Sequence, residues 1–176
     1  GETYPELGGS HYQKLPRQNA NHRDETAPSG KVPKVDFKKS KKIFLALSSL
    51  LCGQKQDEKI VVACHDCSEG GLAVSVAEMC FAGMKGAEID LAKAPLGEKI
   101  TRDNFVLFSE SNSRFIVEVE EGRKNEFERA MQGVTFAEIG RTTDAKKLSV
   151  IGFGSKKIID EDVNGLKAAW KKTLWW

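Results

Sequence analysis

The sequence predicts an α/β (α+β) fold built on a mixed β-sheet, with helices packed mainly on one face. Three observations indicate this class. Segments with helical apolar spacing alternate along the chain with short runs of β-branched and alternating apolar residues. The closing strands follow one another closely enough to pair as hairpins. The 176 residues are 40% hydrophobic and 30% charged, which is sufficient for one core, so we expect a single domain over residues 1–176.

The first third of the chain predicts a helix at each end of a polar loop. Residues 6–13 could form a short helix, whereas residues 16–34 contain three prolines and little to bury, so a flexible loop is expected there. Asp36 is a suitable N-cap for a long helix. The side chains of that helix expected to face the core are Phe37, Phe44, Leu47 and Leu51.

The middle third predicts strands that alternate with helices. The helix after the paired glycines has Leu72, Val76 and Cys80 on one face, with Met79 and Gly83 beside them. The expected elements are a strand at 60–63, a helix at 71–84, a strand at 87–91, a short helix at 103–108 capped by Asp103, and a strand at 114–120.

The last third predicts a helix, three strands and a final helix. Phe127 and Met131 should pack the first of these helices against the core. We expect the first two strands to turn back on each other through Asp144-Ala145. Tryptophans 170, 175 and 176 form an apolar end that either closes the core or marks a contact surface. The ranges are a helix at 122–132, strands at 137–143, 147–153 and 157–159, and a helix at 162–174. The last helix is capped by acid at Asp162 and ends in lysines, which matches its dipole.

The most informative motif is Cys64-His-Asp-Cys-Ser-Glu-Gly-Gly-Leu72, between a strand and a helix. Free N–H groups of Gly70, Gly71 and Leu72 would lie at the helix start, where the helix dipole favours an anion. Asp66 and Ser68 supply side-chain oxygens beside them. The motif predicts a phosphate or other anion site, and ordinary turn chemistry is the alternative interpretation.

A second candidate site is the turn Glu110-Ser-Asn-Ser-Arg114. The guanidinium of Arg114 offers a planar set of donors suited to phosphate or carboxylate, and Ser111 adds a hydroxyl. Glu110 is the acidic member of the group. The alternative is that Arg114 only forms a surface ion pair.

The glycine motif resembles the His-Asp-x-Ser-Asp/Glu-Gly-Gly-Leu segment of the phosphoribosylformylglycinamidine (FGAM) synthase family, within the aminoimidazole ribonucleotide (AIR) synthetase superfamily. Further segments resemble that family's carboxy-terminal domain in the same order, so that the resemblance covers nearly the whole chain. They are Gly1-Glu-Thr3, Glu6-Leu-Gly-Gly-Ser10 with Tyr12, Val32-Pro33 with Asp36, Phe108-Ser-Glu-Ser111 with Arg114, and Leu166-Lys-Ala-Ala-Trp170.

The resemblance implies an AIR synthetase C-terminal-like fold in an ATP-dependent carbon–nitrogen ligase of de novo purine biosynthesis. That enzyme converts formylglycinamide ribonucleotide, ATP and glutamine-derived ammonia to formylglycinamidine ribonucleotide, ADP and phosphate. It further implies ATP and Mg²⁺ as cofactors of the parent enzyme, with no cofactor assigned to this domain alone. The family's catalytic histidine and main magnesium ligands belong to other domains, so we assign no catalytic or metal-binding residue here and expect the isolated domain to be inactive. The domain would assist ligand binding or buttress the catalytic half.

The expected partners follow from the same resemblance. They are the preceding domains of the same polypeptide, a glutaminase domain or subunit and a small accessory subunit, with the chain a fragment of a larger cytoplasmic enzyme. Whether the parent is the long single-chain type or the short multi-subunit type stays open. A net charge of +2 with dispersed lysines does not favour nucleic acid. No apolar run approaches the ~20 residues that span a bilayer, so no membrane partner is expected.

Two alternatives come from other functional classes. One is a purely structural or interaction module. The other is a thiol redox or metal-binding protein, suggested by Cys64-x-x-Cys67 between a strand and a helix. The helix is expected to begin several residues after Cys67, and neither Cys52 nor Cys80 forms a second close pair, so reduced and partly buried thiols are the preferred interpretation.

Overall fold

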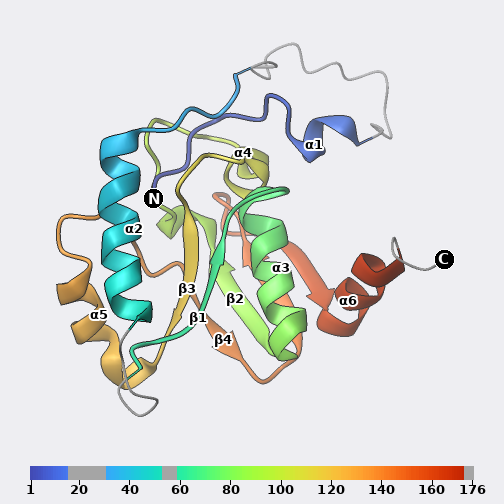
Figure 1. Ribbon diagram of the computed structural model, residues 1–176. Coiled ribbons are helices and arrows are strands. Elements are labelled where there is room, and N and C mark those ends of the chain that lie inside the picture. The colour runs from blue at the N-terminus through green and yellow to red at the C-terminus, as the bar shows by residue number, and fades with distance from the viewer. Residues whose placement is uncertain (16–30, 53–58, 173–176) are drawn as a thin grey trace.

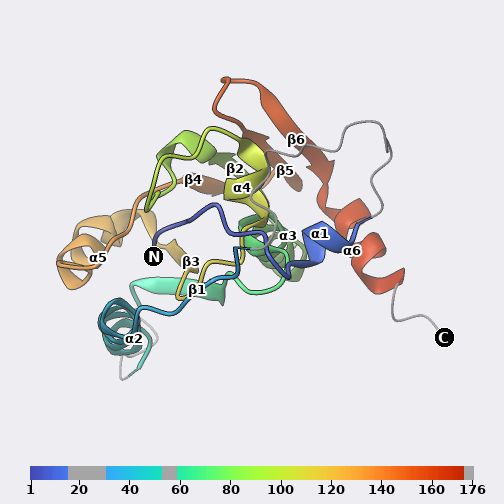
Figure 2. The same cartoon turned by 90° about the horizontal axis from the view of Figure 1, so that it is seen from above.

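Helix α3 (Gly71–Gly83) lies at the centre of the molecule, between a four-stranded sheet and a separate pair of strands (Figures 1 and 2). The structure is a computed structural model that describes residues 1–15, 31–52 and 59–172. Of the predicted loop at about 16–34, residues 16–30 lie outside the described residues. The helices on either side of that loop are α1 (His11–Lys14), which is shorter than predicted, and α2 (Phe37–Leu51).

The four-stranded sheet has the order β4-β2-β5-β6, in which β2 and β5 run parallel and the other neighbours antiparallel. Its strands are β2 (Gly86–Asp90), β4 (Gly140–Thr143), β5 (Lys147–Ile151) and β6 (Lys157–Asp162). One face is buried against α3 and carries Ala87, Ile89, Leu148 and Val150. On the other face Glu88 pairs with Arg141 and Lys147 with Asp160. The predicted mixed sheet with helices on one face is therefore confirmed.

The predicted turn through Asp144-Ala145 does not join two paired strands. Strand β2 lies between β4 and β5, so the strands on either side of this turn are not neighbours in the sheet. The prediction was wrong because β5 forms a parallel pair with β2, a long-range choice that no local spacing specifies. The following hairpin, β5 with β6, forms as expected.

Strands β1 (Val61–Asp66) and β3 (Phe115–Val119) form a separate antiparallel pair. Strand β1 continues past the predicted residue 63 to Asp66, so most of the Cys64–Asp66 segment is extended chain. The side of the pair that carries Phe115, Val117 and Val119 faces a second core, as the alternation predicted. Helix α2 and helix α5 (Lys124–Ala130) cover that core, and Met131 is buried in it.

Helix α2 buries Leu47 as predicted, but the other three predicted core residues are not buried. Its buried residues are Ser40, Ile43, Leu47 and Leu50. Phe37, Phe44 and Leu51 were expected to be buried, but they are 82%, 50% and 49% exposed. The prediction was wrong because the helix carries two apolar stripes, and its spacing alone cannot say which of them faces the core.

The helix caps agree with the sequence in two of three cases. The Asp36 carboxylate accepts hydrogen bonds from the N–H groups of Lys38 and Lys39, at 3.0 and 3.1 Å. Asp162 accepts from Gly165 N–H at 2.9 Å before α6 (Val163–Lys172). Trp175 and Trp176 lie outside the described residues.

Asp103 does not cap α4 (Asp103–Phe108). It is the first helical residue, and its carboxylate accepts from Phe153 N–H at 2.8 Å instead. Asp103 therefore anchors the loop that joins β5 to β6. Within the described stretches, no helix is both long and apolar enough to cross a membrane.

Candidate functional site

The two motifs singled out from the sequence meet at one place, the corner between β1 and α3. Gly70 and Gly71 form this corner with positive φ angles of 78° and 62°. The turn after α4 packs directly on it, because a Cβ built on Gly71 would lie 2.4 Å from the carbonyl oxygen of Ser109. Cys67 N–H also donates to the carbonyl of Arg114 at 2.9 Å. The structure thus brings together residues that are about forty positions apart in the sequence.

The amides of the corner are hydrogen-bonded within the chain. Gly70 N–H donates to Glu110 Oε1 at 2.9 Å, and Gly71 N–H donates to the carbonyl of Ser68 at 3.0 Å. The same Glu110 oxygen accepts from His11 N–H at 3.3 Å. Gly70, Gly71 and Leu72 are all buried. The carboxylate of Glu110 therefore lies where an external anion would contact Gly70.

Arg114 is turned into the protein. Arg114 is only 5% exposed. Its guanidinium donates to Thr3 Oγ1 at 2.9 Å and to the carbonyl of Ser111 at 3.2 Å. A further bond goes to the carbonyl of Ser109. Burial lowers the pKa of Arg114, although the nearby Cys67 thiol and the carboxylates raise it in part. Among the residues that the structure describes, the surface ion pair considered for this arginine does not form.

Ser111 is also buried, and it fastens the N-terminal segment to the turn. Its hydroxyl accepts from Tyr4 N–H at 3.0 Å and donates to Glu6 Oε2 at 3.1 Å. Ser109 donates to the carbonyl of Tyr4 at 2.7 Å. The sequence analysis assigned no role to Ser109, Thr3 or Glu6. Their types alone carried no indication, because a buried polar network is recognised by its partners in space.

Asp66 and Ser68 are the predicted site residues whose side chains are exposed. Ser68 Oγ donates to Asp66, and this hydrogen bond, with a smaller contribution from His65, lowers the pKa of the Asp66 carboxyl. The outer rim of the corner is therefore anionic. That Asp66, Ser68, Gly70, Gly71, Glu110, Ser111 or Arg114 binds a ligand stays a prediction.

His65 links the end of β1 to α3. Its Nε2 lies 2.8 Å from Glu78 Oε2, and its Nδ1 lies 3.4 Å from Asp66 Oδ1. Both ring nitrogens therefore face carboxylates. His65 thus connects the strand before the glycine corner to the helix after it.

Cys64 and Cys67, which suggested the redox alternative, lie in different cores. Cys64 packs in the core under α2, whereas Cys67 is buried in the core around α3. Burial raises the pKa of both thiols, the opposite of what a nucleophilic thiolate requires. Among the described residues, no group of three or more histidines, cysteines or acids could hold a metal ion.

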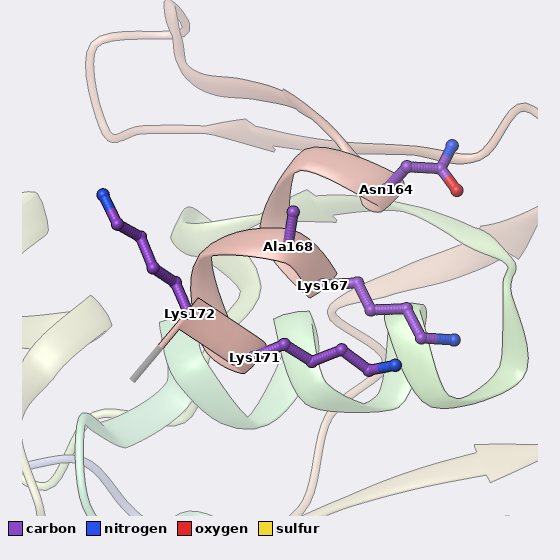
Figure 3. Close-up of a pocket in the computed structure, with 5 residues that line it drawn as sticks. All are labelled: Asn164, Lys167, Ala168, Lys171 and Lys172. Atoms are coloured by element: carbon purple, nitrogen blue, oxygen red, sulfur yellow. The ribbon is translucent and has the colours of Figure 1, made fainter. Parts of the chain in front are cut away.

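A cavity of about 490 Å³ lies along α6, beside the end of α3 and apart from the glycine corner (Figure 3). Its described lining residues are Asn164, Lys167, Ala168, Lys171 and Lys172. Lys167 Nζ also contacts Met84 Sδ at 3.6 Å. Flexible surface lysines without a buried polar partner do not make a defined site, so this cavity adds nothing to the candidate site.

Comparison with known proteins gives a consistent family assignment. The sequence profile described as "AIR synthase related protein, C-terminal domain" matches residues 6–153. The phosphoribosylformylglycinamidine synthase subunit PurL of Moorella thermoacetica is 37% identical over 80% of this chain and 17% of its own length. The PurL subunit of Thermococcus sibiricus is 32% identical over 96% of this chain and 21% of its own length.

Solved structures of Thermotoga maritima proteins share the fold. The match to PurL complexed with FGAR has a TM-score of 0.67 at 18% identity. It covers 81% of this chain and 23% of that chain. The match to PurL complexed with ATP has a TM-score of 0.62 at 20% identity and covers 72% of this chain and 21% of that chain. The match to a structure of PurLQS has a TM-score of 0.66 at 20% identity and covers 82% of this chain and 24% of that chain. The chain spans about a fifth of the length of the curated relatives that it matches.

Proposed function

This chain belongs to the family of AIR synthase related protein C-terminal domains, and we propose that it is the carboxy-terminal domain of an FGAM synthase. The observation that carries the proposal is the match to PurL subunits over 80% and 96% of the chain. The parent enzyme would convert formylglycinamide ribonucleotide, ATP and ammonia to formylglycinamidine ribonucleotide, ADP and phosphate. It would act as an ATP-dependent carbon–nitrogen ligase in the cytoplasm.

Within that enzyme we infer that this domain buttresses the catalytic half. The support is the state of its polar groups: the Gly70 and Gly71 amides are hydrogen-bonded to Glu110 and Ser68, and each nitrogen of the buried Arg114 guanidinium donates to an acceptor inside the protein. These are groups that a ligand-binding domain would leave open. Any direct ligand contact at the corner would fall to the exposed Asp66 and Ser68.

Cofactor and partner assignments belong to the parent enzyme in this proposal. PurL has been solved with ATP and with FGAR, which supports ATP and formylglycinamide ribonucleotide as ligands of the whole enzyme. The PurLQS structure supports further subunits as partners of the parent enzyme. We propose that they are a glutaminase subunit and a small accessory subunit, with glutamine as the ammonia source. The described residues of the corner do not fit a Mg²⁺ site, since Asp66 is the one exposed carboxylate of the predicted set and Ser68 already bonds it. We therefore place Mg²⁺ in other domains.

Activity assays test the enzymatic part of this proposal. The parent polypeptide, supplied with ATP, Mg²⁺, ammonia and formylglycinamide ribonucleotide, should release ADP in a substrate-dependent manner, and this chain alone should not. Absence of that activity from the parent would contradict the assignment. Turnover by the chain alone would contradict the inference that it only buttresses.

A further inference from the structure

The strongest feature that the proposed function leaves unexplained is the outer side of α2. Six of the twelve exposed large apolar side chains among the described residues fall between residues 32 and 51, in the helix or in the segment that leads into it. They are Val32, Val35, Phe37, Phe44, Leu45 and Leu51. Contiguous exposed apolar surface of this kind marks an interaction site more often than isolated apolar residues do.

The side chains of α2 align as a stripe. Phe37, Phe44 and Leu51 are seven residues apart, close to two helical turns, so they project from the same side of the helix. Leu45, which is 62% exposed, lies about 100° further round the helix than Phe44 and widens the exposed apolar surface away from the core. The ring of Phe44 also meets the edge of Phe115 on β3, with centroids 5.7 Å apart, which fixes one point of the stripe on the rigid core. We call these four α2 residues the α2 stripe.

The charge around the α2 stripe is of one sign. The helix contains four lysines and no aspartate or glutamate. Lys39 pairs with Glu2, whereas Lys38, Lys41 and Lys42 form no ion pair with the described residues. Two copies of the chain facing each other through this helix would oppose lysine to lysine, which disfavours a homodimer. A matching surface needs apolar side chains at its centre and carboxylates at its rim.

We propose that the α2 stripe is an intramolecular docking surface for an apolar, carboxylate-rimmed surface elsewhere in the parent polypeptide. This rests on the part of the proposed function that makes the chain a domain of a longer protein. The chain spans only about a fifth of the length of its curated relatives, so most of such a polypeptide lies outside it and is available to cover the stripe. Interfaces between domains of one chain are commonly of this mixed apolar and polar kind.

Thiol labelling of the parent polypeptide and of this chain tests the proposal. Leu45→Cys is introduced into both proteins in a Cys52→Ser background, and modification by a maleimide is followed by mass spectrometry. Labelling of residue 45 should be fast in the chain and about tenfold or more slower in the parent, because the interface must open first. The matched control is Ile158→Cys on β6, where Ile158 is 40% exposed; it should label at similar rates in both. Equal rates at residue 45 would overturn the proposal.

Further measurements separate the other possible occupants. Hydrogen exchange of α2 in the unmodified proteins should show the same protection without any substitution. Adding Lys41→Glu to the parent should speed labelling at residue 45, and an unchanged rate would refute the carboxylate rim. The chain alone should sediment as a monomer and should not bind phosphatidylserine vesicles. A dimer, or vesicle binding, that is lost in Leu45→Ser would overturn the intramolecular assignment. None of these readouts depends on FGAM synthase activity, so failure of the docking surface and failure of the proposed enzyme remain distinguishable.

Discussion

Replacing Gly71 by alanine should destabilise the domain strongly, because this position combines a positive φ with close packing. The left-handed conformation costs a residue with a Cβ about 1–2 kcal/mol. The new Cβ would lie 2.4 Å from the carbonyl oxygen of Ser109 and 2.8 Å from that of Leu107, both in the backbone, which cannot rotate away. Forcing such an overpacked contact adds roughly 1–3 kcal/mol. We therefore expect a loss of about 2–5 kcal/mol from the free energy of unfolding.

Gly133→Ala is the matched control for this prediction. Gly133 has a φ of +81°, and nothing lies within 4 Å of the Cβ it would gain, so it should lose only the conformational part, about 1–2 kcal/mol. Urea denaturation, monitored by circular dichroism, measures the free energy of unfolding that each of the two variants loses. For a domain of this size, each kcal/mol corresponds to roughly 2–4 °C in melting temperature. A Gly71→Ala variant no less stable than Gly133→Ala would refute the packing of the corner against the turn.

Three other predictions concern Arg114 and Glu110 at the glycine corner and Cys80 in the core around α3. Arg114→Lys should lower the free energy of unfolding by about 1–3 kcal/mol in urea titrations, because the compact ammonium of lysine cannot reach three acceptors that are spread around a planar guanidinium; an unchanged stability would contradict the role of these hydrogen bonds. Glu110→Ala should cost about 1–2 kcal/mol by the same method, since it leaves Gly70 N–H without its acceptor, and an unchanged stability would mean that water replaces the carboxylate freely. Burial raises the pKa of Cys80 to about 11, so its thiolate forms only as the pH approaches that value. Cys80 should therefore react with a disulfide reagent at pH 8 far more slowly than the exposed Cys52. Equal rates would show that Cys80 is not buried.

The local elements were predictable because their causes are local. Asp36 caps α2 through the N–H groups two and three residues ahead, and α3 begins at the glycine that the motif indicated. The alternation in β3 gave the correct buried side. Each of these features depends on residues within one or two turns of each other.

The features that failed depend on partners far away in the sequence. The position of β2 between β4 and β5 could not be predicted, because parallel strands are not joined by a tight turn that the local sequence would indicate. The choice between the two apolar stripes of α2 depends on what covers the helix. The two halves of the candidate site were each identified, but the sequence did not show that contacts with the N-terminal segment turn Arg114 and Ser111 inward. Whether these residues bind a ligand stays a prediction.

Calorimetric titration of the isolated chain tests most directly whether the glycine corner is closed by the protein's own groups. MgATP, MgADP and formylglycinamide ribonucleotide are each titrated into the unmodified chain and into Asp66→Ala. We expect no saturable heat with any of them, because Glu110 and Ser68 already accept from the Gly70 and Gly71 amides, and Ser109 accepts from Arg114. Stoichiometric binding by the unmodified chain, lost in Asp66→Ala while that variant stays folded, would show that the corner receives a ligand.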